Sequence, residues 1–259
     1  VLAGTLCPAH PAVRGYAQAL VEDLAHRVGV DAIEIENFAY PSHRDYLGPR
    51  WSQVHIGPNL GYLLSLCFCE HCLRRGEEAN LEMDDLANRV EMIIRQGLAG
   101  DIGDRRIGDE IADPSHPVSR FARVRYETIT SLIDDLTEQT DGGATRLQLV
   151  FREEPDDIWR WGVEPHILRQ RGLHATIKPS CTATATSVFV GRYAEVLQIG
   201  QNLAADIALV APPEPGLNGP TPADVVEACL SVGVDRFVLS HYGLATYDML
   251  DWACMLSRR

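Results

Sequence analysis

Residues 31–37, Asp-Ala-Ile-Glu-Ile-Glu-Asn, alternate apolar and acidic side chains, and this period of two is typical of a β-strand. Residues 11–28 precede them with apolar side chains at steps of three and four, which predicts a helix that starts at Pro11 and stops at Gly29. Further strand patterns lie at residues 146–151, 174–178, 206–211 and 236–240, with helical patterns between several of them. This alternation predicts parallel strands joined by right-handed crossovers.

Two topologies satisfy such an alternation, an open doubly wound sheet and a closed barrel. No glycine-rich phosphate loop follows any of the strand patterns, which disfavours a nucleotide-binding open sheet. The 259 residues are close to the usual length of one barrel domain. We therefore expect residues 1–259 to form a single α/β domain, a (β/α)8 TIM barrel. The five clear strands and a fragment at residues 1–5 fall short of eight, so we expect the N-terminal strands of the barrel to be missing from this sequence.

The composition limits the classes of partner. The formal net charge is −13, and an acidic surface repels the phosphates of nucleic acids and anionic membranes, so neither is expected to be a partner. No apolar run approaches the roughly 20 residues that span a bilayer. The 7 cysteines are too few and too unevenly placed for a disulfide scaffold, which predicts a reducing, cytoplasmic location.

Two stretches interrupt the rhythm of strands and helices. Residues 38–66 form a long connection with aromatic and basic side chains, among them Trp51, and we expect them to form a wall of a binding site. Residues 98–117 are polar and contain glycines and two prolines, which predicts a surface loop.

Three cysteines crowd together in Cys67-Phe-Cys-Glu-His-Cys72, a C-x-C-x2-C motif that brings three thiolates into one tight turn. Zinc binds such thiolates tetrahedrally, and sites dominated by sulfur are closed and structural. A fourth ligand must come from elsewhere, and we favour Cys7, which lies between a strand fragment and a helix start. The other candidates are His10, His55 and His71. Three reduced cysteines packed in a turn, or a redox-active pair at Cys69 and Cys72, are the alternative interpretations.

The order of these motifs resembles a known family. The segment Cys7-Pro-Ala-His-Pro-Ala-Val-Arg14, a helix, an acidic strand and then the C-x-C-x2-C turn are similar to the zinc-containing β-galactosidases of clan A of the glycoside hydrolases, and to uncharacterised barrel proteins allied to them. The resemblance covers roughly residues 5–75. It implies a (β/α)8 barrel, with a zinc-binding insertion around residues 38–75 and a structural zinc ion bound by Cys7, Cys67, Cys69 and Cys72.

The resemblance also implies a glycosidase active site at the C-terminal ends of the strands. Because the related galactosidases often form trimers, it further implies a homo-oligomer. The sequence departs from the family at one decisive position. The family carries its acid/base glutamate directly after an asparagine at the end of the fourth strand, whereas here Asn37 is followed by Phe38.

Two glutamates of the first clear strand are candidates for chemistry. Glu34 and Glu36 share one face of the strand, opposite the two isoleucines. Glu36 lies nearer the C-terminal end, where barrel enzymes carry their active sites, so we expect it to be a catalytic or substrate-binding carboxylate. Glycosidases need a second carboxylate facing the first. The position of the family nucleophile favours Glu214, and the alternatives are Glu153 and Glu154.

Other residues near strand ends are candidates for substrate binding. Lys178 could bind an anionic or carbonyl substrate, form a Schiff base, or pair with one of the two glutamates. His241 and Tyr242 end the last strand and offer a hydrogen-bonding group and an aromatic platform for a sugar. The complete expected set is Glu34, Asn37, Trp51, Lys178, His241 and Tyr242. In the structural alternative, Glu34 pairs with Lys178 or Arg152, Glu36 only binds substrate hydroxyls, and Glu214 is a surface residue.

The leading hypothesis is a glycoside hydrolase that acts on a carbohydrate substrate and carries a structural zinc ion. The second hypothesis is a barrel that binds a sugar without cleaving it, which the phenylalanine at position 38 favours. The third is a lyase or aldolase-type enzyme that depends on Lys178.

Overall fold

The computed structural model describes residues 6–41, 56–140, 144–151, 156–164, 173–178, 183–197, 203–209, 221–234, 236–240, 243 and 245–256. The chain divides into two compact units. The first, which we call the helical unit, comprises residues 1–30, 37–142 and 157–164. The second, the sheet unit, comprises residues 31–36, 143–156 and 165–259. The expectation of a single domain stays a prediction, and each unit is described by itself.

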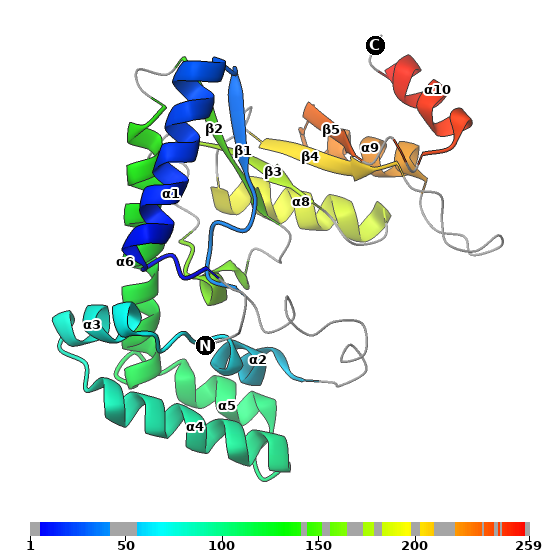
Figure 1. Ribbon diagram of the computed structural model, residues 1–259. Coiled ribbons are helices and arrows are strands. Elements are labelled where there is room, and N and C mark those ends of the chain that lie inside the picture. The colour runs from blue at the N-terminus through cyan, green and yellow to red at the C-terminus, as the bar shows by residue number, and fades with distance from the viewer. Residues whose placement is uncertain are drawn as a thin grey trace. The chain divides into compact units, whose positions relative to one another are not determined.

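The helical unit contains, in chain order, α1 (Pro11–Glu22), a π-helical turn η1 (Asp23–Val28), α2 (Pro58–Leu64), α3 (Glu70–Glu78), α4 (Met83–Ala99), α5 (Asp104–Ile111), α6 (Pro117–Glu138) and the 3-10 turn η3 (Ile158–Trp161) (Figure 1). The helix predicted over residues 11–28 is confirmed as α1 and η1. Gly29 ends it with a φ of 73°, a left-handed conformation that suits glycine.

Helix α6 is the centre of the helical unit, and it contacts α1, α3, α4 and η3. Apolar side chains recur along α6 at steps of three and four residues, so they lie on one face of the helix. This face points inward, and its side chains are buried. The buried residues on this face include Phe121, Val124, Thr128, Ile129, Leu132, Ile133 and Leu136. No helix in the part of the chain that the structure describes is both long and apolar enough to cross a membrane.

The predicted surface loop at residues 98–117 is wrong, because α5 lies within it. Ile107 and Ile111 are spaced four residues apart and are both buried, so they give this polar segment an inward face. The long connection at residues 38–66 likewise contains α2, whose Leu60 and Leu63 are buried. In both segments a few apolar side chains at helical spacing are enough to hold a short helix against its neighbours.

Among its described residues, the sheet unit contains five strands: β1 (Ala32–Ile35), β2 (Arg146–Phe151), β3 (His174–Ile177), β4 (Leu203–Ala208) and β5 (Arg236–Ser240). All neighbours are parallel, in the order β1-β2-β3-β4-β5. Three helices accompany them, α8 (Ala183–Leu197), α9 (Pro222–Ser231) and α10 (Tyr247–Leu256). The five clear strand predictions are confirmed, although β4 begins three residues before the predicted 206–211, and the strand fragment predicted at residues 1–5 lies outside the described residues. At the start of α9, Thr221 forms a capping box with Asp224.

The prediction of a (β/α)8 barrel is wrong. In the described residues the sheet has five strands, and β1 and β5 are its two edges rather than partners. Closing a barrel requires the first and last strands to pair, with a tilt and stagger that fit the number of strands. The alternation of strands and helices indicated the parallel α/β class correctly, but it carries no signal for closure.

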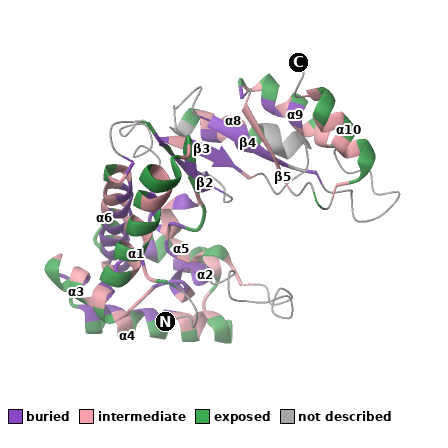
Figure 2. Ribbon diagram, turned by 45° about the horizontal axis from the view of Figure 1, so that its top comes forward, coloured by how far each residue is buried: buried purple, intermediate pink, exposed green. Residues whose placement is uncertain are grey.

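The sheet has one apolar face and one polar face because strand side chains alternate. Figure 2 shows buried residues along β2, β3 and β4. On the apolar face Phe151 contacts Tyr193 of α8, with ring centroids 5.7 Å apart, so α8 covers this face. The register places Glu34 beside Gln148 on the opposite face. That face, which we call the polar face, also carries Thr176, Lys178 and Asp206.

Candidate metal centre and carboxylate cluster

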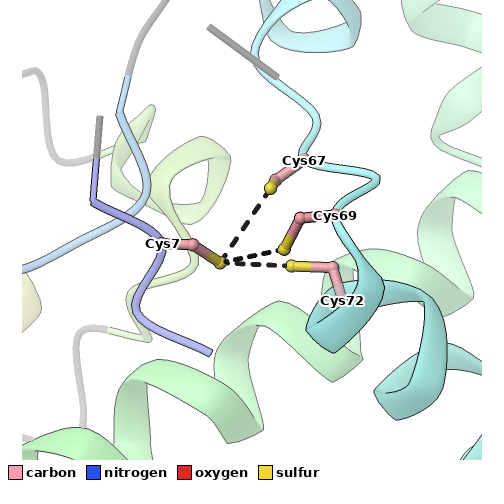
Figure 3. Close-up of side chains that lie close together, drawn as sticks. All are labelled: Cys7, Cys67, Cys69 and Cys72. Carbon is pink, nitrogen blue, oxygen red and sulfur yellow. Dashed lines mark hydrogen bonds between the residues drawn. The ribbon is translucent and has the colours of Figure 1, made fainter. Parts of the chain in front are cut away.

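The structure brings Cys7, Cys67, Cys69 and Cys72 together in the helical unit (Figure 3). The Sγ atom of Cys7 lies 3.5 Å from that of Cys72, 3.6 Å from that of Cys69 and 3.9 Å from that of Cys67. All four sulfur atoms lie within 4.8 Å of one another. These four residues could therefore bind one metal ion.

The geometry of the cluster fits a tetrahedral sulfur site. Four sulfur atoms placed about 2.3 Å from a central zinc ion would be separated by about 3.8 Å. The three distances from Cys7, between 3.5 and 3.9 Å, bracket this value. An all-sulfur set of donors selects soft or borderline cations over magnesium or calcium, which prefer oxygen.

Two turns present the four cysteines. Cys7 lies in the turn before α1, where the backbone N–H of His10 donates to the carbonyl oxygen of Cys7 at 2.9 Å. The second turn leads into α3, with Cys69 as its N-cap and Cys72 in the first helical turn. The partial positive charge at the start of a helix favours thiolate there. A helix thus begins close to Cys7, and another begins within the turn that carries Cys67, Cys69 and Cys72.

Arg14 of α1 fixes the first turn to α6. Its guanidinium donates to Asp135 Oδ2 from Nε at 3.1 Å and from Nη2 at 2.5 Å. Nη1 donates to the carbonyl oxygens of Pro8 and Thr128, and Nη2 also donates to Ser131 Oγ. Arg14 therefore ties the residue that follows Cys7 to the central helix through a forked, charge-assisted contact.

The second turn is attached to the same helix by an aromatic contact. The ring of Phe68, between Cys67 and Cys69, stacks on Phe121 of α6 with centroids 5.8 Å apart. Because α6 anchors both turns, the four sulfur atoms are held together by packing and hydrogen bonds that do not themselves need an ion.

Contacts among the thiols redistribute their acidity. The contacts with Cys7 and then Cys72 lower the pKa of Cys67 to about 2. The contact with Cys67 raises the pKa of Cys7 to about 12 and also raises that of Cys72. Without a cation these contacts thus oppose the simultaneous ionisation of Cys7, Cys67 and Cys72. A dication would stabilise further thiolates and release their protons.

Two of the histidines considered as fourth ligands are not part of the cysteine cluster. The rings of His10 and His71 contact each other edge to face at 4.3 Å, and neither belongs to a group of potential metal ligands among the described residues. His10 Nδ1 instead accepts a hydrogen bond from the backbone N–H of Ala12 and caps α1. His55 lies outside the described residues.

Two residues beside the cluster were not identified from the sequence as parts of the site. Tyr40 is buried, and its Oη lies 3.8 Å from Cys72 Sγ. Burial, followed by the charge of Cys72, holds the pKa of Tyr40 well above its usual value. The guanidinium of Arg125 lies 4.4 Å from the centroid of the Tyr40 ring. An arginine on the otherwise apolar face of α6 was the available signal.

On the polar face of the sheet, Lys178 joins two carboxylates. Its Nζ lies 3.0 Å from Glu36 Oε1 and 3.3 Å from Asp206 Oδ2. The Asp206 side chain is only 5% exposed, and its Oδ1 has no hydrogen-bond partner within the described ranges. Burial lowers the pKa of Lys178, but the hydrogen bond to Glu36 and the charge of Asp206 outweigh burial, so this pKa lies above its usual value.

Glu34 takes part in a separate network on the polar face. Its Oε2 accepts hydrogen bonds from Gln148 Nε2 and Thr176 Oγ1, each at 3.0 Å. Lys178 was expected to pair with Glu34 or Glu36, and the structure shows the pair with Glu36. The second contact of Lys178, with Asp206, was not predicted. An aspartate within the apolar pattern of residues 203–209 was the signal for it.

The other expected site residues are placed as follows. Asn37 follows β1 with a φ of 57°, a left-handed conformation that asparagine tolerates, and the next residue, Phe38, is buried. Trp51, Arg152, Glu153, Glu154, Glu214, His241 and Tyr242 lie outside the described residues.

Comparison of the chain with protein-family models, curated proteins and solved structures finds no match. The resemblance to zinc-containing β-galactosidases therefore stays a prediction that rests on the motifs quoted above.

Proposed function

We propose that the four cysteines bind one zinc ion and that this ion has a structural role. Four thiolates would fill a tetrahedral coordination shell and leave no position for a catalytic water. The attachment of both cysteine turns to α6 supports a role in holding the helical unit together. Chelation is expected to lower the thermal stability of a protein that stays folded in the metal-free form. An unchanged thermal stability after complete removal of zinc would contradict this role.

We further propose that the polar face is the active site of a glycoside hydrolase, with Glu36 and Asp206 as its carboxylate pair. The observation that carries this proposal is the position of Lys178 Nζ between the two carboxylates. Because the contacting oxygens lie 3.0 and 3.3 Å from one nitrogen, they are at most about 6.3 Å apart, which is compatible with the roughly 5–5.5 Å of retaining glycosidases and shorter than the roughly 6.5–9.5 Å of inverting ones.

The proposed division of labour follows from exposure. Glu36 is the more accessible carboxyl, with a side chain 35% exposed, and would protonate the glycosidic oxygen as its bond to the anomeric carbon breaks. The bonding electron pair leaves with that oxygen. Asp206, nearly buried, would act as the nucleophile: its Oδ1 would form a bond to the anomeric carbon as the glycosidic bond breaks, and water that gives a proton to Glu36 would then hydrolyse this intermediate and restore both carboxyl groups. Lys178 would orient both groups.

Hydrolysis of a panel of aryl glycosides tests the proposal. Glu36→Gln and Asp206→Asn are each expected to reduce kcat by more than about 100-fold, the usual range for removing an acid or base. Glu91→Gln is the control, because Glu91 is an exposed residue of α4. No hydrolysis by the zinc-loaded wild type, across the panel, would contradict the hydrolase.

The two other hypotheses make different predictions. Sugar binding without cleavage is supported by the burial of Phe38, which removes the position of the family's acid from the surface. It predicts saturable sugar binding in calorimetry with no turnover. A Schiff-base enzyme is disfavoured, because the raised pKa of Lys178 keeps its amine protonated. Lys178 is the only lysine of the sequence, so borohydride trapping with a carbonyl compound reports on this residue directly.

A further inference from the structure

Arg125 of α6 is a buried cation that forms no hydrogen bond or ion pair with the residues that the structure describes, so we ask what compensates its charge. The residue is 1% exposed. Its guanidinium lies 4.4 Å from the ring centroid of Tyr40 and 5.2 Å from that of Tyr62. None of its three guanidinium nitrogen atoms has a hydrogen-bond partner within the part of the chain that the structure describes.

Contacts with the tyrosine rings do not account for this burial. A cation near an aromatic face is attracted by the ring, but the in-plane N–H donors remain unsatisfied. A charge removed from water destabilises a protein strongly unless an opposite charge compensates it. The positive charge of Arg125 therefore requires a negative charge close to it.

Tyr40 connects Arg125 with the cysteine cluster. One face of its ring lies beside the guanidinium, while its Oη lies 3.8 Å from Cys72 Sγ. Tyr40 and Cys72 are each 2% exposed, so the path from the cation to this sulfur along the tyrosine is shielded from bulk solvent. Electrostatic interactions between buried groups are screened far less than those at the surface.

Metal binding would create the missing negative charge. Four thiolates around one zinc dication leave a net charge of −2 on the centre. We propose that Arg125 is the buried counter-charge of the metal-loaded cysteine cluster, positioned by Tyr40 and Tyr62, and that it favours the loaded state over the metal-free state. This inference rests on the proposed metal centre and adds a positioning residue outside the ligand set.

A counter-charge at Arg125 would affect the metal-free and the metal-loaded protein in opposite ways, whereas a packing residue would affect both alike. In the metal-free protein the net charge of −2 of a zinc–thiolate centre is absent, so the charge of Arg125 is poorly compensated and destabilises the fold. In the loaded cluster the same charge is compensated. Neutralising Arg125 should therefore weaken zinc binding while stabilising, or leaving unchanged, the metal-free protein.

A matched pair of variants tests the charge itself. Arg125→Lys and Arg125→Gln both remove the planar guanidinium, and they differ from each other chiefly in charge. Zinc affinity is measured by competition with a chromophoric chelator, and the metal-free stability by urea unfolding. We expect Arg125→Gln to bind zinc about tenfold or more weakly than Arg125→Lys, the range typical of groups that support metal ligands. We expect the metal-free Gln variant to be at least as stable as the Lys variant.

Arg160→Gln is the control, because Arg160 lies over Trp159 rather than Tyr40 and should leave zinc affinity unchanged. Equal zinc affinities of Arg125→Lys and Arg125→Gln would overturn the counter-charge and leave the metal centre intact. A lower stability of the Gln variant in both states by the same amount would also overturn it, as a packing effect. Failure of the wild type to bind zinc would overturn the metal centre and this inference together.

If neither Arg125 variant folds, Tyr40→Phe provides the second test. It keeps the ring beside Arg125 and removes the oxygen near Cys72. We expect zinc affinity to fall several-fold without loss of the fold, and an unchanged affinity would contradict the role given to Tyr40.

Discussion

The sulfur atoms of Cys7 and Cys72 lie 3.5 Å apart although 65 positions separate the two residues. One residue belongs to the turn before α1 and the other to the first turn of α3. An ion bound between them would close a long loop of the chain, and closing a long loop removes conformational entropy from the unfolded state. The cluster is thus placed where a metal ion would stabilise the helical unit most effectively.

Removing one ligand should abolish this stabilisation. Cys72→Ser is expected to lose the zinc-dependent part of the unfolding free energy, about 4 kcal/mol for the wild type at a free zinc concentration roughly 1,000 times Kd. Urea unfolding with and without zinc measures it. Cys254→Ser is the control, because Cys254 is exposed and lies in α10. An unchanged zinc dependence in Cys72→Ser would show that the ion stabilises the protein from another site.

Arg14→Lys tests the attachment of the first cysteine turn. Lysine cannot reproduce the forked contact with Asp135 or donate to Pro8 and Thr128 at the same time. We expect a loss of about 2–3 kcal/mol in unfolding free energy, measured in urea, together with weaker zinc binding. Arg27→Lys is the matched control, because Arg27 is 84% exposed in its ion pair with Asp23 and should cost less than about 0.5 kcal/mol.

His116 should make the helical unit sensitive to acid. Its Nδ1 accepts a hydrogen bond from the backbone N–H of Val118 and caps α6. Burial, followed by the charge of Arg89, lowers the pKa of His116, and the nearby Glu110 and Asp113 only partly oppose these effects. The unfolded chain therefore takes up a proton below about pH 6.5 that the folded protein resists.

Stability is expected to be complete above this pH and to fall below it, by up to about 1.4 kcal/mol per pH unit. His116→Asn keeps a capping side chain and should remove this loss. Urea unfolding at about pH 7 and about pH 5 measures the difference. His26→Asn, at an exposed position, should not alter it. The same pH dependence in His116→Asn and the wild type would contradict the assignment.

Lys178 offers a direct measurement of the carboxylate cluster. Since it is the only lysine, selective carbon-13 labelling gives a single side-chain NMR signal. We expect a pKa above its usual value, lowered in Asp206→Asn and in Glu36→Gln. The ion pairs then stabilise the fold fully below about pH 10.4 and lose this effect as the pH rises through the folded-state pKa. An ordinary pKa, insensitive to both substitutions, would contradict the cluster.

Local patterns predicted much of this fold. The alternation in residues 31–37 located β1 and placed Glu34 and Glu36 on one face. The steps of three and four residues between apolar side chains located the helix over residues 11–28, and Gly29 marked its end. These features depend on neighbouring residues, and such signals are visible in one sequence. The choice of Cys7 as the fourth cysteine came from its position before a helix and from the resemblance, and the structure places it with the other three.

Long-range relations were not predictable in the same way. Closure of the sheet depends on which strands meet at its edges, and the wrong barrel prediction came from counting βα units alone. The contact of Asp206 with Lys178 depends on the register between β3 and β4, which has no local signal. The position of Arg125 beside Tyr40 depends on a segment far along the chain. For Asp206 and Arg125, the only local sign was a charged residue within an apolar pattern.

The zinc content of the purified protein, measured by native mass spectrometry and by competition titration, tests the proposed metal centre most directly. We predict one zinc ion per chain in the wild type, and none in a Cys7→Ser/Cys72→Ser double variant that remains folded in the metal-free form. A wild type that binds no zinc, or a double variant that retains one ion with unchanged affinity, would contradict the metal centre.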